Sequence, residues 1–206
     1  VTNGIADAPA GAGGGARDYP FLMTSQDPVF KHPTAWNWNF TVQRELPGAM
    51  TLETAYVGRR GYYLQRIRNL NSLHLGDTWS NPGINPDALR PYRGVGIVRL
   101  AENAGKSIYH GLQVQLERRF SSGLGFGVAY TFSKLLDNGD SKGTTLPDAY
   151  DDTNFWAVSS LSRKHVLIIN YIYEIPFLAR NRSLLGKTLG GWEISGVTQL
   201  QSGAPL

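Results

Sequence analysis

The sequence contains no cysteine and little charge. Its 206 residues include 20 Lys+Arg and 16 Asp+Glu, a net charge of +4, and charged residues make up 17% of the chain, against about 25% in typical soluble domains. The absence of cysteine excludes a disulfide scaffold, a thiolate zinc site and a cysteine nucleophile. The longest aliphatic run, residues 166–169, is far shorter than the about 20 apolar residues of a membrane helix. We therefore expect no membrane-spanning helix, and no basic-then-apolar signal peptide opens the sequence.

Motifs for catalysis or cofactor binding are missing as well. The four histidines are widely separated, so no His-x-x-x-His spacing brings two of them to one metal. Ser133 and Ser141 have no evident His and Asp partners for a catalytic triad. The basic residues are scattered and form no basic helix or long basic run. We expect a protein that is not an enzyme, with no cofactor and no nucleic-acid partner.

An acidic loop near residues 135–163 leaves calcium binding open. It lacks the twelve-residue ligand loop that has glycine at its sixth place, so a solvated acidic loop is the simpler interpretation. The carboxylates in question are Asp137, Asp140, Asp148, Asp151 and Asp152.

Alternation of apolar and polar residues is the strongest pattern in the sequence. At residues 36–43 and 112–117 every even position is apolar and every odd position polar. At residues 124–133 every even position is large and apolar, and every odd one is small. A period of two predicts strands with two unlike faces. We expect six main strands, at residues 36–46, 51–58, 108–120, 124–134, 165–175 and 192–202.

The connections between these strands alternate in length. Short turns follow residues 46 and 120, whereas long loops are expected near 59–106 and 135–163. This rhythm predicts an all-β fold of antiparallel up-and-down strands with the long loops at one end. Residues 1–34, rich in glycine, alanine and proline, are expected to be a flexible or extended segment ahead of the β segment at 35–206.

Three features favour a segment of a transmembrane-type β-barrel over a soluble β-sandwich, which stays the alternative. Eleven residues tilted by about 45° span about 25 Å, the height of a barrel's apolar band. The polar positions are mostly amides, hydroxyls and small residues, as a hydrated inner wall requires. Aromatic residues gather near the strand ends, as in the interfacial girdles of outer-membrane barrels.

Residues 28 to 206 resemble the barrel of TonB-dependent outer-membrane receptors of the Oar-like kind. The matching pieces follow one another in the order that this family shows them. They are residues 38–47, 56–58, 90–92, 109–120, 130–134, 163–166, 173–177, 190–196 and 201–205.

The resemblance implies a bacterial outer-membrane receptor with a signal peptide, a plug and a barrel of about 22 strands. This sequence shows no plug, no TonB-contact segment and no signal peptide, so we expect an interior slice of the barrel. The smallest bacterial outer-membrane barrels close with about 8 strands, so six strands are too few. A six-strand sheet leaves two unpaired edges. Its expected partners are therefore outer-membrane lipid and either the remaining barrel strands or other copies of itself; a transported ligand is not identifiable.

Three functions follow, in order of preference. The first is a wall segment of a TonB-dependent receptor that takes up a solute through the outer membrane. The second is a released fragment that self-assembles through its strand edges into an extracellular fibre. The third is a soluble β-sandwich binding module.

Four arginines fall at the long-loop ends of the predicted strands, where an outer-membrane barrel meets anionic lipopolysaccharide. We expect them to face outward and contact this lipid, with a solvated basic loop as the alternative. They are Arg59, Arg60, Arg66 and Arg68.

Overall fold

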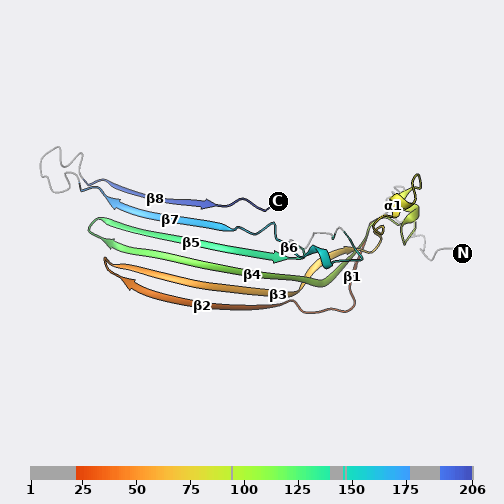
Figure 1. The fold of residues 1–206 in the computed structure, drawn as a ribbon, viewed down its shortest axis with the longest axis horizontal. Coiled ribbons are helices and arrows are strands. Elements are labelled where there is room, and N and C mark those ends of the chain that lie inside the picture. Colours follow the sequence, from red (N-terminus) through yellow and green to blue (C-terminus); the bar gives the residue numbers. More distant parts are fainter. Residues whose placement is uncertain (1–21, 94, 140–145, 147, 177–190, 206) are drawn as a thin grey trace, which may run out of the picture.

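The computed structural model describes residues 22–93, 95–139, 146, 148–176 and 191–205. All the strands in these residues belong to one sheet (Figure 1). Its six long strands lie side by side in chain order, and each is antiparallel to the next. The all-β, up-and-down prediction is therefore confirmed. The six strands are β2 (Thr34–Leu46), β3 (Met50–Asn69), β4 (Val98–Ser121), β5 (Leu124–Asp137), β7 (His165–Glu174) and β8 (Glu193–Gln201).

The two ends of the sheet differ, as the alternating connection lengths predict. At one end, the turn end, β2 joins β3 and β4 joins β5 through tight turns (Figure 1). Gly48 and Gly123 have φ of 85° and 79° there, a left-handed conformation that glycine adopts without a Cβ clash. The opposite end, the loop end, carries both long connections. It also carries the short elements β1 (Met23–Gln26), α1 (Asp77–Ser80), α2 (Pro86–Leu89), η1 (Thr153–Phe155) and β6 (Ala157–Val158).

The prediction of a long loop near 59–106 was wrong in its extent. β3 continues to Asn69 and β4 already begins at Val98, so the connection is limited to residues 70–97. Register shifts between Gly61 and Gln65 interrupt the pairing of these strands, and such irregularities hide the period-two pattern. Of the segment expected to be flexible or extended, residues 1–21 lie outside the described residues. Its last part forms β1, which pairs in parallel with β4, and the start of β2.

The register places like residues side by side across the sheet. Phe40 pairs with Tyr56, Tyr56 with Leu112, and Leu112 with Phe132. One residue further along, Thr41 begins a row that continues through an alanine, a glutamine and a threonine. Because neighbouring residues of a strand point to opposite faces, these rows define an apolar face and a polar face. The apolar face comprises Trp38, Phe40, Val42, Tyr56, Leu112, Val114, Leu116, Phe126, Val128, Tyr130, Phe132, Leu167, Ile169, Tyr171 and Leu200.

No protein layer covers the apolar face in the part of the chain that the structure describes. Trp36 is 66% exposed and Phe40 69%, and among the described residues the buried apolar ones are Ala55, Leu146 and Ala149. A soluble sandwich would cover such a face with a second sheet, but all the described strands belong to one sheet. The sandwich interpretation therefore has no support in the described residues. None of the described helices has the length and apolar character needed to cross a membrane.

Candidate functional site

The apolar face has the height of a bilayer's hydrocarbon region. On β4, His110 and Arg118 flank three apolar residues, Leu112, Val114 and Leu116. The eight-residue interval between His110 and Arg118 measures about 26 Å along the strand at about 3.3 Å per residue. Tilted by about 35–45°, it covers about 19–22 Å of membrane thickness, close to the apolar band of about 25 Å on outer-membrane barrels.

Tyrosine–histidine pairs mark the loop-end border of this face. Tyr56 Oη lies 2.7 Å from His110 Nδ1, and Tyr130 Oη lies 2.8 Å from His165 Nδ1. In both pairs the histidine belongs to the following long strand, two residues before the tyrosine's register partner. The rings of each pair are stacked, and Trp38 contacts His110 edge-on. Such rings, apolar in body and polar at one edge, suit the boundary between hydrocarbon and headgroups.

A second group of aromatic residues borders the turn end. Phe126 and Tyr171 are register partners there, and Tyr173 and Trp192 lie further toward the same end. Tyr171 lies over Gly196 of the neighbouring strand, where an added Cβ would meet its Oη at 2.8 Å. The apolar face therefore carries an aromatic border at each end, which confirms the predicted grouping of aromatics near strand ends.

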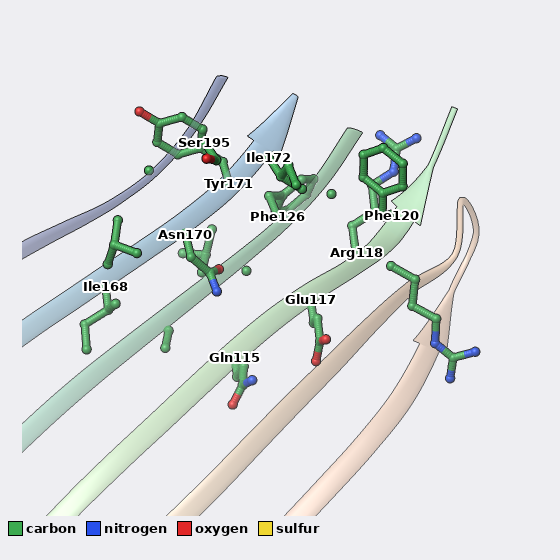
Figure 2. A pocket seen from close by; sticks show the side chains of 17 residues that line it. Gln115, Glu117, Arg118, Phe120, Phe126, Ile168, Asn170, Tyr171, Ile172 and Ser195 are labelled. Carbon is green, nitrogen blue, oxygen red and sulfur yellow. The ribbon is translucent and has the colours of Figure 1, made fainter. Parts of the chain in front are cut away.

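On β2, β4 and β5 the polar face carries mainly hydrogen-bonding and small side chains, whereas β7 contributes Val166, Ile168 and Ile172 to the same face. A hollow of ≈ 610 Å³ lies at the turn end, where Gly125, Gly127 and Ala129 leave space. In Figure 2, Gln115, Glu117 and Asn170 extend from one side of the sheet, and the Tyr171 ring extends from the other. Amides and a carboxylate bind water and polar groups, so this face can line a hydrated interior. The remaining polar-face side chains include Asn37, Asn39, Thr41, Gln43, Gln113, Thr131, Ser195 and Gln199.

A sheet with one lipid-compatible face and one hydrated face is the wall of a membrane barrel. The family model of the outer membrane beta barrel domain matches residues 1–206. The chain belongs to the outer-membrane β-barrel family. No curated protein and no solved structure matches it.

Family membership locates the chain in the outer membrane and orients the two faces. In these barrels the apolar face meets lipid and the polar face lines the interior, with short turns in the periplasm and longer loops outside. The loop end is therefore the extracellular end. The described sheet supplies six spanning strands, and its edge strands β2 and β8 each have one unpaired side within the described residues.

Above the membrane, the described residues of 70–97 and 148–162 form a compact unit that we call the outer lobe. Asn71, fully buried, is its centre. Asn71 Nδ2 donates to the carbonyl oxygens of Tyr92, Val95 and Gly96 at 2.8–3.0 Å, and its Oδ1 accepts from Tyr92 N at 2.8 Å. Its own carbonyl accepts from Arg90 Nη1 at 2.6 Å. One side chain thus replaces the backbone pairing that the irregular loop lacks.

The two long connections are joined through Tyr150. Its ring stacks on His74 with centroids 3.9 Å apart, and its hydroxyl donates to the Ser72 carbonyl at 2.8 Å. Burial raises the pKa of Tyr150 above its usual value of 10.0, and the nearby carboxylates Asp77 and Asp148 add to the effect. The neutral, donating phenol is therefore the form that holds the loops together.

An ion-pair network ties the outer lobe to the extended strands. Arg66 Nε lies 2.8 Å from Glu102 Oε1, and Arg66 Nη1 lies 2.7 Å from Asp152 Oδ2. Arg68 Nη2 lies 2.8 Å from the other oxygen of Glu102. Both Arg66 and Glu102 are buried. Two of the four arginines predicted to contact lipopolysaccharide are therefore already paired with carboxylates of this chain.

The other two predicted arginines lie on opposite faces. Arg59 pairs in register with Asn37 on the polar face, so it does not share the outward orientation expected for all four. Arg60 pairs with Trp36 on the apolar face and lies 4.8 Å from the Tyr62 ring centroid, at the extracellular border. Lipopolysaccharide contact stays a prediction, and Arg60 is the residue best placed for it.

The acidic-loop residues have protein partners where they are described. Asp148 accepts from Tyr150 N at 2.8 Å, and Asp151 accepts from Thr153. These hydrogen bonds from Thr153 hold the pKa of Asp151 below its usual value of 3.8. Asp137 lies at the end of β5, whereas Asp140 lies outside the described residues. Within the described part, no three His, Asp or Glu residues gather to form a metal site.

Sequence reasoning missed the two residues that organise the outer lobe. Asn71 and Glu102 lie in no motif, and the partners of the Asn71 carbonyl and of both side chains are 19 or more positions away. The only signal was the frequency of Asn, Pro and Gly in residues 69–96, which indicates turns but not which side chain stabilises them.

Proposed function

We propose that the chain is a wall segment of a TonB-dependent receptor that carries a scarce or bulky solute across the outer membrane. The observation behind this is a sheet of six long antiparallel strands whose apolar face opposes a face that is rich in amides, hydroxyls and small residues on β2, β4 and β5. The ordered resemblance to Oar-like receptor barrels supports it further. The chain contributes structure and binding surface, with no catalytic step of its own.

The outer lobe is the part of this wall that would meet a solute first. Its outermost turn exposes Leu75 by 96% and Trp79 by 90%. Exposed apolar groups of this size on an otherwise well-bonded loop favour a binding role. We propose that the lobe contacts solute at this turn while the plug and TonB contact of the complete receptor perform the gating.

Uptake is tested by comparing the solutes that cells remove from a defined medium. We expect at least one solute to be depleted by wild-type cells and to persist with cells that lack the gene. It should also persist with wild-type cells whose proton-motive force is dissipated, because TonB-coupled transport needs that energy. Identical depletion profiles in all three cultures would refute the receptor.

A second candidate function is a subunit of an extracellular fibre. It is favoured by the two edges that are unpaired within the described residues, because five antiparallel steps leave β2 and β8 running in opposite directions. The β8 edge of one copy therefore continues the antiparallel order onto the β2 edge of another. Regular polymers in cell-free medium without detergent would support this function. A detergent requirement with heat-modifiable gel mobility would support the membrane wall instead.

A further inference from the structure

A groove on the apolar face, at its extracellular border, has the composition of a binding site for a phosphorylated lipid. Its floor is formed by Leu112, Phe132 and Val158. The polar and basic residues that line the groove are Tyr56, His110, Lys134, Lys164, Ser162 and Ser202. The floor lies where the membrane's hydrocarbon begins, and these polar and basic residues lie where headgroups lie.

The basic groups of this groove come from three neighbouring segments. Lys134 on β5 is the register partner of His110 on β4, and such partners have Cβ atoms about 4.5–5.5 Å apart. The carbonyl oxygen of Lys164 accepts a hydrogen bond from Ser133 N, so Lys164 lies opposite the residue that precedes Lys134, and both lysines line the groove. His110 uses Nδ1 for Tyr56, so its Nε2 is the nitrogen that remains for a ligand.

These lysines have no acidic partner among the described residues. The ion pairs there involve arginines 66, 68 and 90 only, and no carboxylate is among the described residues that line the groove. A lysine at the edge of hydrocarbon keeps its ammonium group in the headgroup layer, where a phosphate is the complementary charge. The charge and the apolar floor together therefore select an amphiphile with a phosphate and an acyl chain.

We propose that this groove binds the phosphorylated head of an outer-leaflet lipid, with lipid A as the occupant. One phosphate is held by Lys134, Lys164 and His110, while an acyl chain lies over Leu112 and Phe132. The site differs from the predicted arginine contacts. The lipid A proposal depends only on the chain's location in the outer membrane. A failure of TonB-coupled uptake would therefore not refute it.

The test is a titration of the detergent-solubilised full-length protein with diphosphoryl lipid A, followed by native mass spectrometry. The double variant Lys134→Gln/Lys164→Gln should bind about 30-fold more weakly, since each lysine near an anionic headgroup contributes about fivefold. The matched control is Arg44→Gln/Arg118→Gln, which removes two cations from the same face at the turn end. This control should bind as the wild type does.

Two further titrations distinguish the contribution of the phosphate from that of the acyl chain. Dephosphorylated lipid A should bind the wild type as weakly as diphosphoryl lipid A binds the lysine variant. Millimolar inorganic phosphate should displace little lipid, because it lacks the acyl chain. Equal binding of phosphorylated and dephosphorylated lipid, equal binding by the lysine variant and the wild type, or full displacement by inorganic phosphate would overturn the proposal. Unchanged heat-modifiable mobility of the variant shows that its barrel is folded.

Discussion

Replacement of Glu102 by glutamine is the sharpest test of how the outer lobe is held to the barrel. Glu102 compensates two arginines at 2.8 Å each, and its side chain is 6% exposed. Removal of one partner from a buried ion pair costs about 3–5 kcal/mol, because a buried charge remains unpaired. Asp152 still faces Arg66 in the variant, so we expect the lower end of this range, about 3 kcal/mol.

The matched control is Asp87→Asn. Its ion pair with Arg90 has the same 2.8 Å separation, but the Asp87 side chain is 52% exposed. Exposed pairs contribute about 0–1 kcal/mol because water screens them. Both variants remove one carboxylate charge at 2.8 Å from an arginine, and they differ in burial and in the number of arginines that the carboxylate pairs with, two for Glu102 and one for Asp87.

Hydrogen exchange of the full-length protein in detergent measures the difference. Amides of residues 64–69 and 98–103 should exchange about a hundredfold faster in Glu102→Gln, since about 3 kcal/mol of local stability is lost. Amides at the centre of β4 should keep their protection. Equal exchange in Glu102→Gln and Asp87→Asn would refute the reasoning. The double variant Arg66→Met/Glu102→Leu should recover protection, because it removes both buried charges.

Three further outcomes are expected. In Gly58→Ala the new methyl group overlaps the Trp38 indole, so tryptophan emission should shift and stability should fall by about 1–3 kcal/mol; unchanged emission would contradict this contact. Asn71→Ala leaves the carbonyls of Tyr92, Val95 and Gly96 without this donor. Each unpaired group costs about 1–3 kcal/mol of local stability. Limited proteolysis should therefore cleave residues 70–97 about a hundredfold faster than in wild type. Because the folded-state pKa of Tyr150 is raised, its stabilisation is complete below the unfolded pKa of about 10 and is lost as pH rises through the folded value. The protection factors of amides near His74, which compare exchange with the intrinsic rate at each pH, should therefore fall at alkaline pH in wild type, and Tyr150→Phe should lack this fall.

The spanning strands were predictable because their pattern follows from local chemistry. Residues 36–43, 112–117 and 124–133 alternate without interruption, and the structure places each on a strand with the expected faces. Pairing partners of adjacent strands also followed, since short turns force neighbouring strands together.

The extracellular half was not predictable in the same way. The upper part of β3 buries Arg66 against Glu102, so charged residues occupy the interior there and the apolar periodicity disappears. The parallel pairing of β1 with β4 joins residues about 75 positions apart, as does the Tyr150–Ser72 hydrogen bond, which spans 78. No local pattern specifies such partners.

By itself, the sequence determined that β2, β4 and β5 would each present one apolar side and one side of polar or small residues, because that property depends only on which residues alternate. Only the tertiary structure decided which basic groups stay available at the membrane border. Arg66 is neutralised by carboxylates from two other segments, whereas Lys134 and Lys164 both line an apolar groove. The physical reason is that charge compensation depends on distance in space, and that distance is set by strand register and loop packing.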